Sequence, residues 1–122
     1  MSMKRLIEAV EQSQEKVNFE DADLSRVIFT NANLSGANMK EANFEGANLT
    51  GAKFGRDATL KDANFTGTDF SGAIMRDANF IGTKFIGANF LGADLKEADL
   101  RGAVNLDKVI WPKGYRLMKE NR

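Results

Sequence analysis

Large apolar residues recur every five positions through most of this chain. We call the large apolar residue of each unit its centre, and seventeen centres follow one another. They are Phe19, Leu24, Phe29, Leu34, Met39, Phe44, Leu49, Phe54 and, after one step of six, Leu60, Phe65, Phe70, Met75, Phe80, Phe85, Phe90, Leu95 and Leu100. The residue two positions before a centre is alanine in thirteen of the seventeen units, and the residue between them is usually Asn or Asp.

This period excludes a single helix and a long flat strand. In a helix, successive centres would step by roughly 140° around the axis, and in a strand they would point to alternate faces because five is odd. The backbone must therefore turn a corner in every unit. The second residue after each centre is mostly Gly, Asn or Asp, the residues that turns favour. The pattern predicts an all-β solenoid with the seventeen centres as its structural core.

The tandem motif A-(N/D)-(L/F)-x-x resembles the pentapeptide repeat family, and it covers residues 17–104. This resemblance implies a right-handed quadrilateral β-helix with four units per coil, and hence about four coils here. It also implies that the centres and the small residues point inward. The segment "WPKGY" after the repeats is similar to the tails of some cyanobacterial members.

Both ends of such a rod expose apolar cross-sections, so we expect caps. Residues 1–16 predict an N-terminal capping helix, because their apolar residues have amphipathic spacing: Met3, Leu6, Ile7 and Val10. Residues 17–104 form the predicted β-helix, and residues 105–122 the predicted C-terminal cap or tail. If the tail covers its own coil, the protein is a monomer. If the tail stays exposed, a homodimer through the C-terminal end follows.

Composition removes most enzyme classes. The chain has no Cys and no His, and seventeen basic residues balance seventeen acidic ones. Thiol and imidazole chemistry are therefore excluded, and no Asp or Glu occupies an inward position where burial would shift its pKa. We predict no catalytic residues, no cofactor, no metal site and no small-molecule substrate. No apolar run is long enough for a signal peptide or a membrane span, so a cytoplasmic protein without membrane contact is expected.

Two features of the repeats are candidates for function. Ile74, Ile81, Ile86 and Leu91 are apolar at positions that face outward, and Trp111 with Tyr115 follows the repeats. These six residues form either an interface or, more simply, scattered surface residues and a cap. The extra residue between Phe54 and Leu60 marks either a projecting loop or a bulge at one corner, and a single residue favours the bulge.

The favoured function is a non-catalytic structural or protein–protein interaction module that binds an unidentified protein partner. The alternative, implied by the family, is a DNA mimic that binds and modulates DNA gyrase or another topoisomerase. A mimic needs a dense field of one sign, whereas residues 19–104 carry twelve acidic and nine basic residues. The near-neutral charge also argues against direct nucleic-acid binding.

Overall fold

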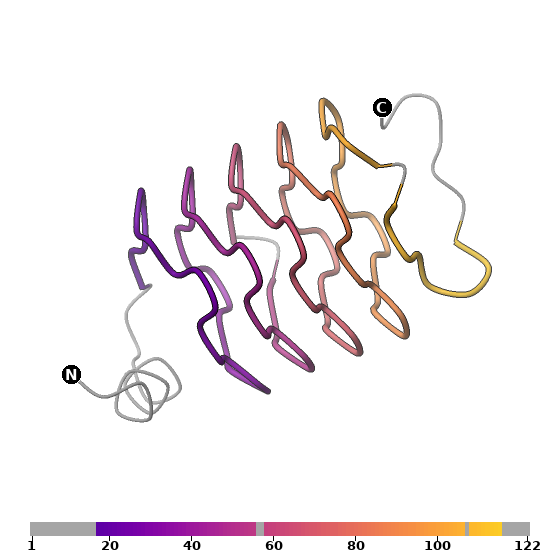
Figure 1. The fold of residues 1–122 in the computed structure, drawn as a ribbon. Helices are drawn as coiled ribbons and strands as arrows, with labels where there is room; N and C mark the ends of the chain where they lie inside the picture. The colour runs from indigo at the N-terminus through magenta and orange to yellow at the C-terminus, as the bar shows by residue number, and fades with distance from the viewer. Residues whose placement is uncertain (1–16, 56–57, 107, 116–122) are drawn as a thin grey trace.

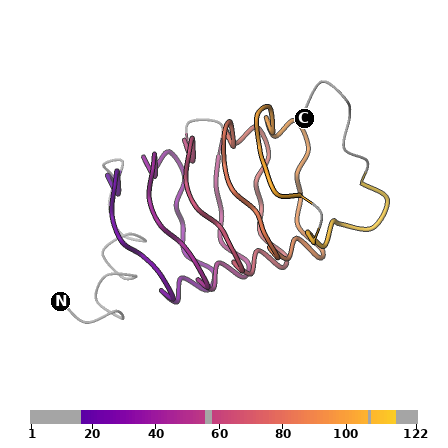
Figure 2. The ribbon, with the colours of Figure 1, turned by 45° about the horizontal axis from the view of Figure 1, so that its top comes forward.

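A computed structural model describes residues 17–55, 58–106 and 108–115. The predicted capping helix over 1–16 and the last residues of the predicted tail, 116–122, lie outside these ranges. The described chain winds in successive coils along one axis, from indigo near residue 17 to yellow near residue 115 (Figure 1). The second view shows the same stack of coils (Figure 2). The architecture is the β-solenoid that the five-residue period predicts.

Neighbouring coils are joined by parallel backbone pairing. Within the described residues this pairing consists of fifteen isolated bridges, because each extended piece ends at a corner before a longer strand can form. The first bridge joins Asn18 to Asn38, which are 20 residues apart, so that one coil contains four five-residue units. In each of the seventeen units, the bridged residue is the one between the small residue and the centre.

The bridged residues define four faces of the rod, which we call A to D. Face A carries Asn18, Asn38, Thr59, Asn79 and Asp99, and face B carries Asp23, Asn43, Asn64, Lys84 and Val104. Face C carries Ile28, Asn48, Asp69, Asn89 and Ile110, and face D carries Asn33, Lys53, Ile74 and Asp94. Each face is followed along the chain by a corner, which we give the letter of that face.

Each bridge contains two backbone hydrogen bonds. Asn38 donates its N–H to the carbonyl of Val17 at 2.8 Å, and its own carbonyl accepts the N–H of Phe19 at 2.6 Å. Corners add a third bond between coils, as when Asp21 donates to the carbonyl of Lys40 at 3.0 Å. Because pairing engages the backbone on both sides of every middle coil, few backbone groups are left unpaired there.

The core lies inside the coils and consists of the centres and the small residues. Phe19 in the first coil is partly buried, and the sixteen centres from Leu24 to Leu100 are buried. The rings on face C stack along the rod axis, with centroids 4.8 Å apart between Phe70 and Phe90. The buried Thr68 and Thr83 fill alanine positions and donate their hydroxyls to the carbonyls of Phe44 and Phe80 at 2.7 and 2.8 Å.

The extra residue after Phe54 is absorbed at corner D. Bridge partners become 21 residues apart from Asn38–Thr59 to Lys53–Ile74 and then return to 20. Ala58 closes its turn on the carbonyl of Gly55 at 2.9 Å, whereas a regular corner closes on the centre itself. Phe54 and Ala58 stay buried, with exposures of 3% and 1%. Residues 56–57 lie outside the description, but the flanking pairing and burial agree with a bulge at one corner.

Parallel pairing continues past residue 104, the predicted end of the β-helix. Ile110 bridges to Asn89, and Trp111 then takes the position of a centre on face C. The Trp111 ring stacks on Phe90 at 5.5 Å, and Tyr115 stacks on Trp111 at 5.2 Å. Leu106 and Val109 also pack against the core. The described part of segment 105–122 therefore adds one repeat and covers the end of the aromatic stack.

Truncation of Phe70 tests how much the aromatic stack inside the coils contributes to stability. The side chain is fully buried between the rings of neighbouring units, so Phe70→Ala should lower the free energy of unfolding by about 3–5 kcal/mol. Chemical denaturation followed by circular dichroism measures the change. Leu91→Ala, at a side chain that is 58% exposed, is the control and should cost less than about 0.5 kcal/mol. Equal losses in both variants would contradict this account of the core.

A second prediction concerns the corners. Gly87 has a φ of +68°, and an added Cβ would meet no atom within 4 Å. Gly87→Ala should therefore cost about 1–2 kcal/mol through backbone strain alone. Glu97 already holds a side chain at a φ of +62°, so Glu97→Ala should change stability by less than about 0.5 kcal/mol. The same denaturation experiment compares the two, and a Gly87→Ala loss no larger than that of Glu97→Ala would argue against corner strain.

Candidate interaction surface

The outward surface is organised by the corners. In each regular corner, the N–H of the next small residue donates to the carbonyl of the centre, as from Ala22 to Phe19 at 3.0 Å. The second corner residue has a positive φ, and in the described corners this residue is Gly or a polar or charged residue. A positive φ at this position alone is the geometry of a type II turn. Glycine at many corners, and Asn or Asp at others, follows from this requirement.

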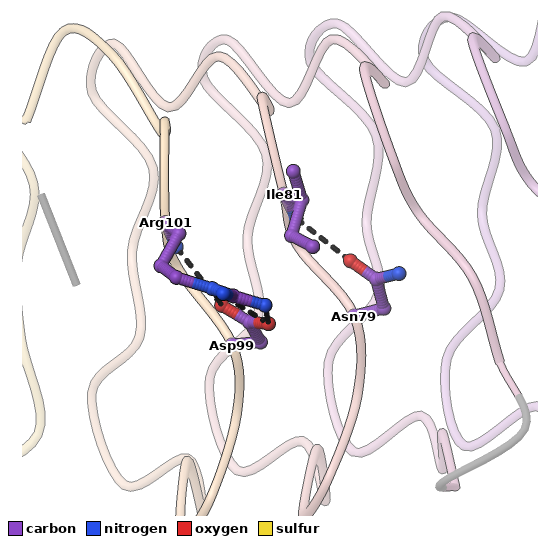
Figure 3. A network of polar contacts seen from close by, with 4 residues as sticks. All are labelled: Asn79, Ile81, Asp99 and Arg101. Carbon is purple, nitrogen blue, oxygen red and sulfur yellow. Dashed lines mark hydrogen bonds and ion pairs between the residues drawn. The ribbon is translucent and has the colours of Figure 1, made fainter. Parts of the chain in front are cut away.

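The Asn or Asp on each face stabilises the corner that follows it. Its side-chain oxygen accepts a hydrogen bond from the backbone N–H two positions later. Asn79 accepts from Ile81 at 2.9 Å, and Asp99 accepts from Arg101 at 3.1 Å (Figure 3). The repeat pattern placed these side chains outward but did not reveal this role. The signal was available in the sequence, because Asn and Asp are the residues that bond to the backbone two positions on.

Corner A carries a ladder of charged side chains. Asp21, Glu41 and Asp62 occupy its second position in three successive coils, with Lys40 and Lys61 beside them at the first. A side-chain hydrogen bond with Asp21, together with the negative charge of Asp21, raises the pKa of the Glu41 carboxyl above its ordinary value of 4.5. Acids stacked at the spacing of the coils therefore repel one another, and the neighbouring lysines offset part of this repulsion.

Among the described residues, Asp99–Arg101 and Arg76–Asp94 form ion pairs on the adjacent surface. The Arg101 guanidinium donates to both oxygens of Asp99, with Nη2 2.7 Å from Oδ2 (Figure 3). This contact lowers the pKa of the Asp99 carboxyl and raises that of Arg101. Arg76 at corner D pairs with Asp94 on face D at 2.7 Å. Faces A and D, with their corners, thus present both signs of charge.

The predicted apolar interface residues do not form one group. Ile81 is half-buried at corner A, and Ile74 is 43% exposed on face D. Ile86 at corner B and Leu91 at corner C are 44% and 58% exposed. Trp111 and Tyr115 are half-buried against the core rather than free on the surface, and burial raises the pKa of the Tyr115 hydroxyl.

Three exposed apolar residues were missed by the sequence patterns, and the first of them, Ile28 on face C, is 56% exposed. Val104 on face B and Ile110 on face C are 45% and 52% exposed. Ile110 lies between Val109 and Trp111 in a unit that begins one residue late, after a second step of six. The step of six residues from Phe54 to Leu60 shows that a unit can begin one residue late, and the same reading of the sequence could have revealed the unit of Ile110. Among the residues described here, no three His, Cys, Asp or Glu side chains are grouped to hold a metal ion.

The sequence matches known repeats over most of its length. A family model described as pentapeptide repeats matches residues 18–56 and 73–104, and a second one with the same description matches residues 39–87. No curated protein matches the chain significantly.

Solved structures of similar proteins share the fold. A pentapeptide repeat protein from the thylakoid lumen of Arabidopsis thaliana aligns with a TM-score of 0.75 and 27% identity, over 84% of this chain and 69% of that one. Rfr23, from the cyanobacterium Cyanothece 51142, aligns with a TM-score of 0.51 and 21% identity, over 90% and 99%. QnrB1, a plasmid-mediated fluoroquinolone resistance protein, aligns with a TM-score of 0.44 and 23% identity, over 77% and 52%. The first two alignments support the β-solenoid, and the third is too weak to carry an argument.

The repulsion between Asp21 and Glu41 in the charged ladder of corner A predicts that the stability of the protein depends on pH. Because the pKa of Glu41 is raised in the folded protein, its ionisation opposes folding above that pKa, and the effect disappears below the ordinary value. Glu41→Gln should therefore be more stable than the parent at pH 7, and the difference should vanish below about pH 4.5. Urea denaturation across this range measures it. Glu45→Gln, at an exposed position outside the ladder, should show no such gain, and a parent as stable as Glu41→Gln at pH 7 would refute the repulsion.

Proposed function

Because the chain belongs to the pentapeptide repeat family, we propose that it is a non-catalytic structural module that binds a protein partner through its mixed-charge surface. The observation that carries this proposal is the charged ladder of corner A, with Asp21, Glu41 and Asp62 beside Lys40 and Lys61. Family membership alone supports the fold and leaves the function open. The proposal therefore rests on the surface of this chain.

Rigid spacing makes such a ladder suitable for recognition. Coils joined by parallel pairing stand about 4.8 Å apart, so charges at equivalent corner positions keep fixed separations. The backbone bonds of the corners, such as the one from Asp21 to Lys40 at 3.0 Å, hold the positions from which these side chains project. A partner with complementary charges would meet a preorganised surface, which favours specificity and rapid association.

The alternative of a gyrase-binding DNA mimic receives less support. Duplex DNA presents a continuous field of negative charge, whereas corner A and face D carry side chains of both signs. A cytoplasmic location belongs to the same proposal, and cell fractionation would test it.

Charge inversion on corner A tests the proposal. Tagged full-length protein should recover the same partner from a lysate repeatedly, and Lys40→Glu/Lys61→Glu should recover at least about fivefold less, since an inverted pair repels the complementary surface. Lys84→Glu, an exposed lysine on face B, is the matched control and should retain the partner. Equal recovery by all variants would place the interface elsewhere. Inhibition of gyrase supercoiling by micromolar protein would instead favour the alternative.

A further inference from the structure

Four exposed apolar residues gather in the last two coils. Ile86, Leu91, Val104 and Ile110 are 44%, 58%, 45% and 52% exposed, and we call them the C-terminal ridge. Pairing brings them together, because Val104 bridges to Lys84 and Ile110 bridges to Asn89. Ile86 lies at the corner between Lys84 and Asn89, and Leu91 follows at the next corner. Exposed apolar residues gathered in this way mark a surface that meets a partner.

The ridge is convex. Val104 lies on face B, Ile86 at corner B, Ile110 on face C and Leu91 at corner C. A flat rigid partner would contact one of these faces and leave the other in water. A deformable apolar layer can instead follow both sides of the corner, with Ile86 at its apex. The interfacial region of a lipid bilayer is such a layer.

The described charged side chains on faces B and C of the coils that hold the ridge are basic. Among the described residues of the last two coils on faces B and C and the segment that follows, the charged side chains are Lys84, Lys108 and Lys113, and all three are exposed. In the sequence, residues 105–122 carry five basic and two acidic residues, a net charge of +3. Residues 19–104 carry nine basic and twelve acidic residues, a net charge of −3. An anionic surface would therefore attract the C-terminal end and repel the rest of the rod.

We propose that the C-terminal ridge and its lysines dock this protein on the surface of an anionic lipid bilayer. Attachment is peripheral, since the described residues include no helix long and apolar enough to cross a membrane. Peripheral docking differs from the expected lack of membrane contact, which rested on the absence of an apolar run long enough for a signal peptide or a membrane span. Docking through faces B and C leaves corner A free, so it does not depend on the protein partner proposed above.

Vesicle binding by the full-length protein tests the proposal. The probes are sedimenting vesicles of phosphatidylcholine alone and of phosphatidylcholine with about 30% phosphatidylglycerol, a composition that supplies the anionic surface potential. We expect at least about tenfold stronger partitioning onto the anionic vesicles, and a severalfold decrease when NaCl rises from about 0.1 to about 0.5 M. Equal partitioning onto both vesicles, or none onto either, would overturn the proposal.

Matched variants locate the contact. Ile86→Ser/Leu91→Ser/Ile110→Ser should reduce partitioning onto anionic vesicles at least about tenfold, because three apolar side chains leave the interface. Ile28→Ser/Ile74→Ser removes side chains of similar exposure, 56% and 43%, from the first coil of face C and from face D. This control should stay within about twofold of the parent. Circular dichroism checks that both variants are folded, and an equal loss in the control would show that the ridge is not the contact. Loss of vesicle binding with retained partner capture separates the two proposals.

Discussion

Parallel backbone pairing between coils is the constraint on which the rest of this structure depends. Every bridged residue beyond the first described coil donates to one carbonyl and accepts from one N–H of the preceding coil, as Asn38 does with Val17 and Phe19. These bonds require each unit to be extended for about three residues and then to turn. The alanine positions, the centres and the positive φ of the corners are consequences of that requirement. Without pairing, no unit buries enough apolar surface to be stable alone.

Backbone pairing restricts the residue type at some positions of each unit and leaves other positions free to vary. Small residues and centres are fixed by the interior, and the second corner residue is limited by its positive φ. The bridged residue and the first corner residue point outward, and they can vary without loss of pairing. The lysines of corner A and the apolar side chains of the ridge occupy these free positions. Surface chemistry can therefore differ between proteins of this fold while the coils stay the same.

The rod tolerates irregularity where a corner can absorb it. One extra residue at corner D moves the bridge spacing from 20 to 21 for a single coil, and Phe54 and Ala58 remain buried. A second extra residue before Ile110 lets Trp111 enter the aromatic stack above Phe90. Corners accept these residues because a bulge disturbs the local turn and leaves the next inward pair in place.

The five-residue period by itself determined which residues face inward, where the corners lie and that the chain forms a β-solenoid. The reason is local: burial and turn geometry act on residues within one unit. Which outward residues become neighbours was decided only by the tertiary structure, because they are about 20 residues apart in the sequence and the coil length sets their register. Ile74 and Ile81 are close to Ile86 and Leu91 in the sequence. In the structure, Ile74 lies on face D and Ile81 at corner A, outside the ridge. Val104 and Ile110 join the ridge only because the last coil pairs with Lys84 and Asn89.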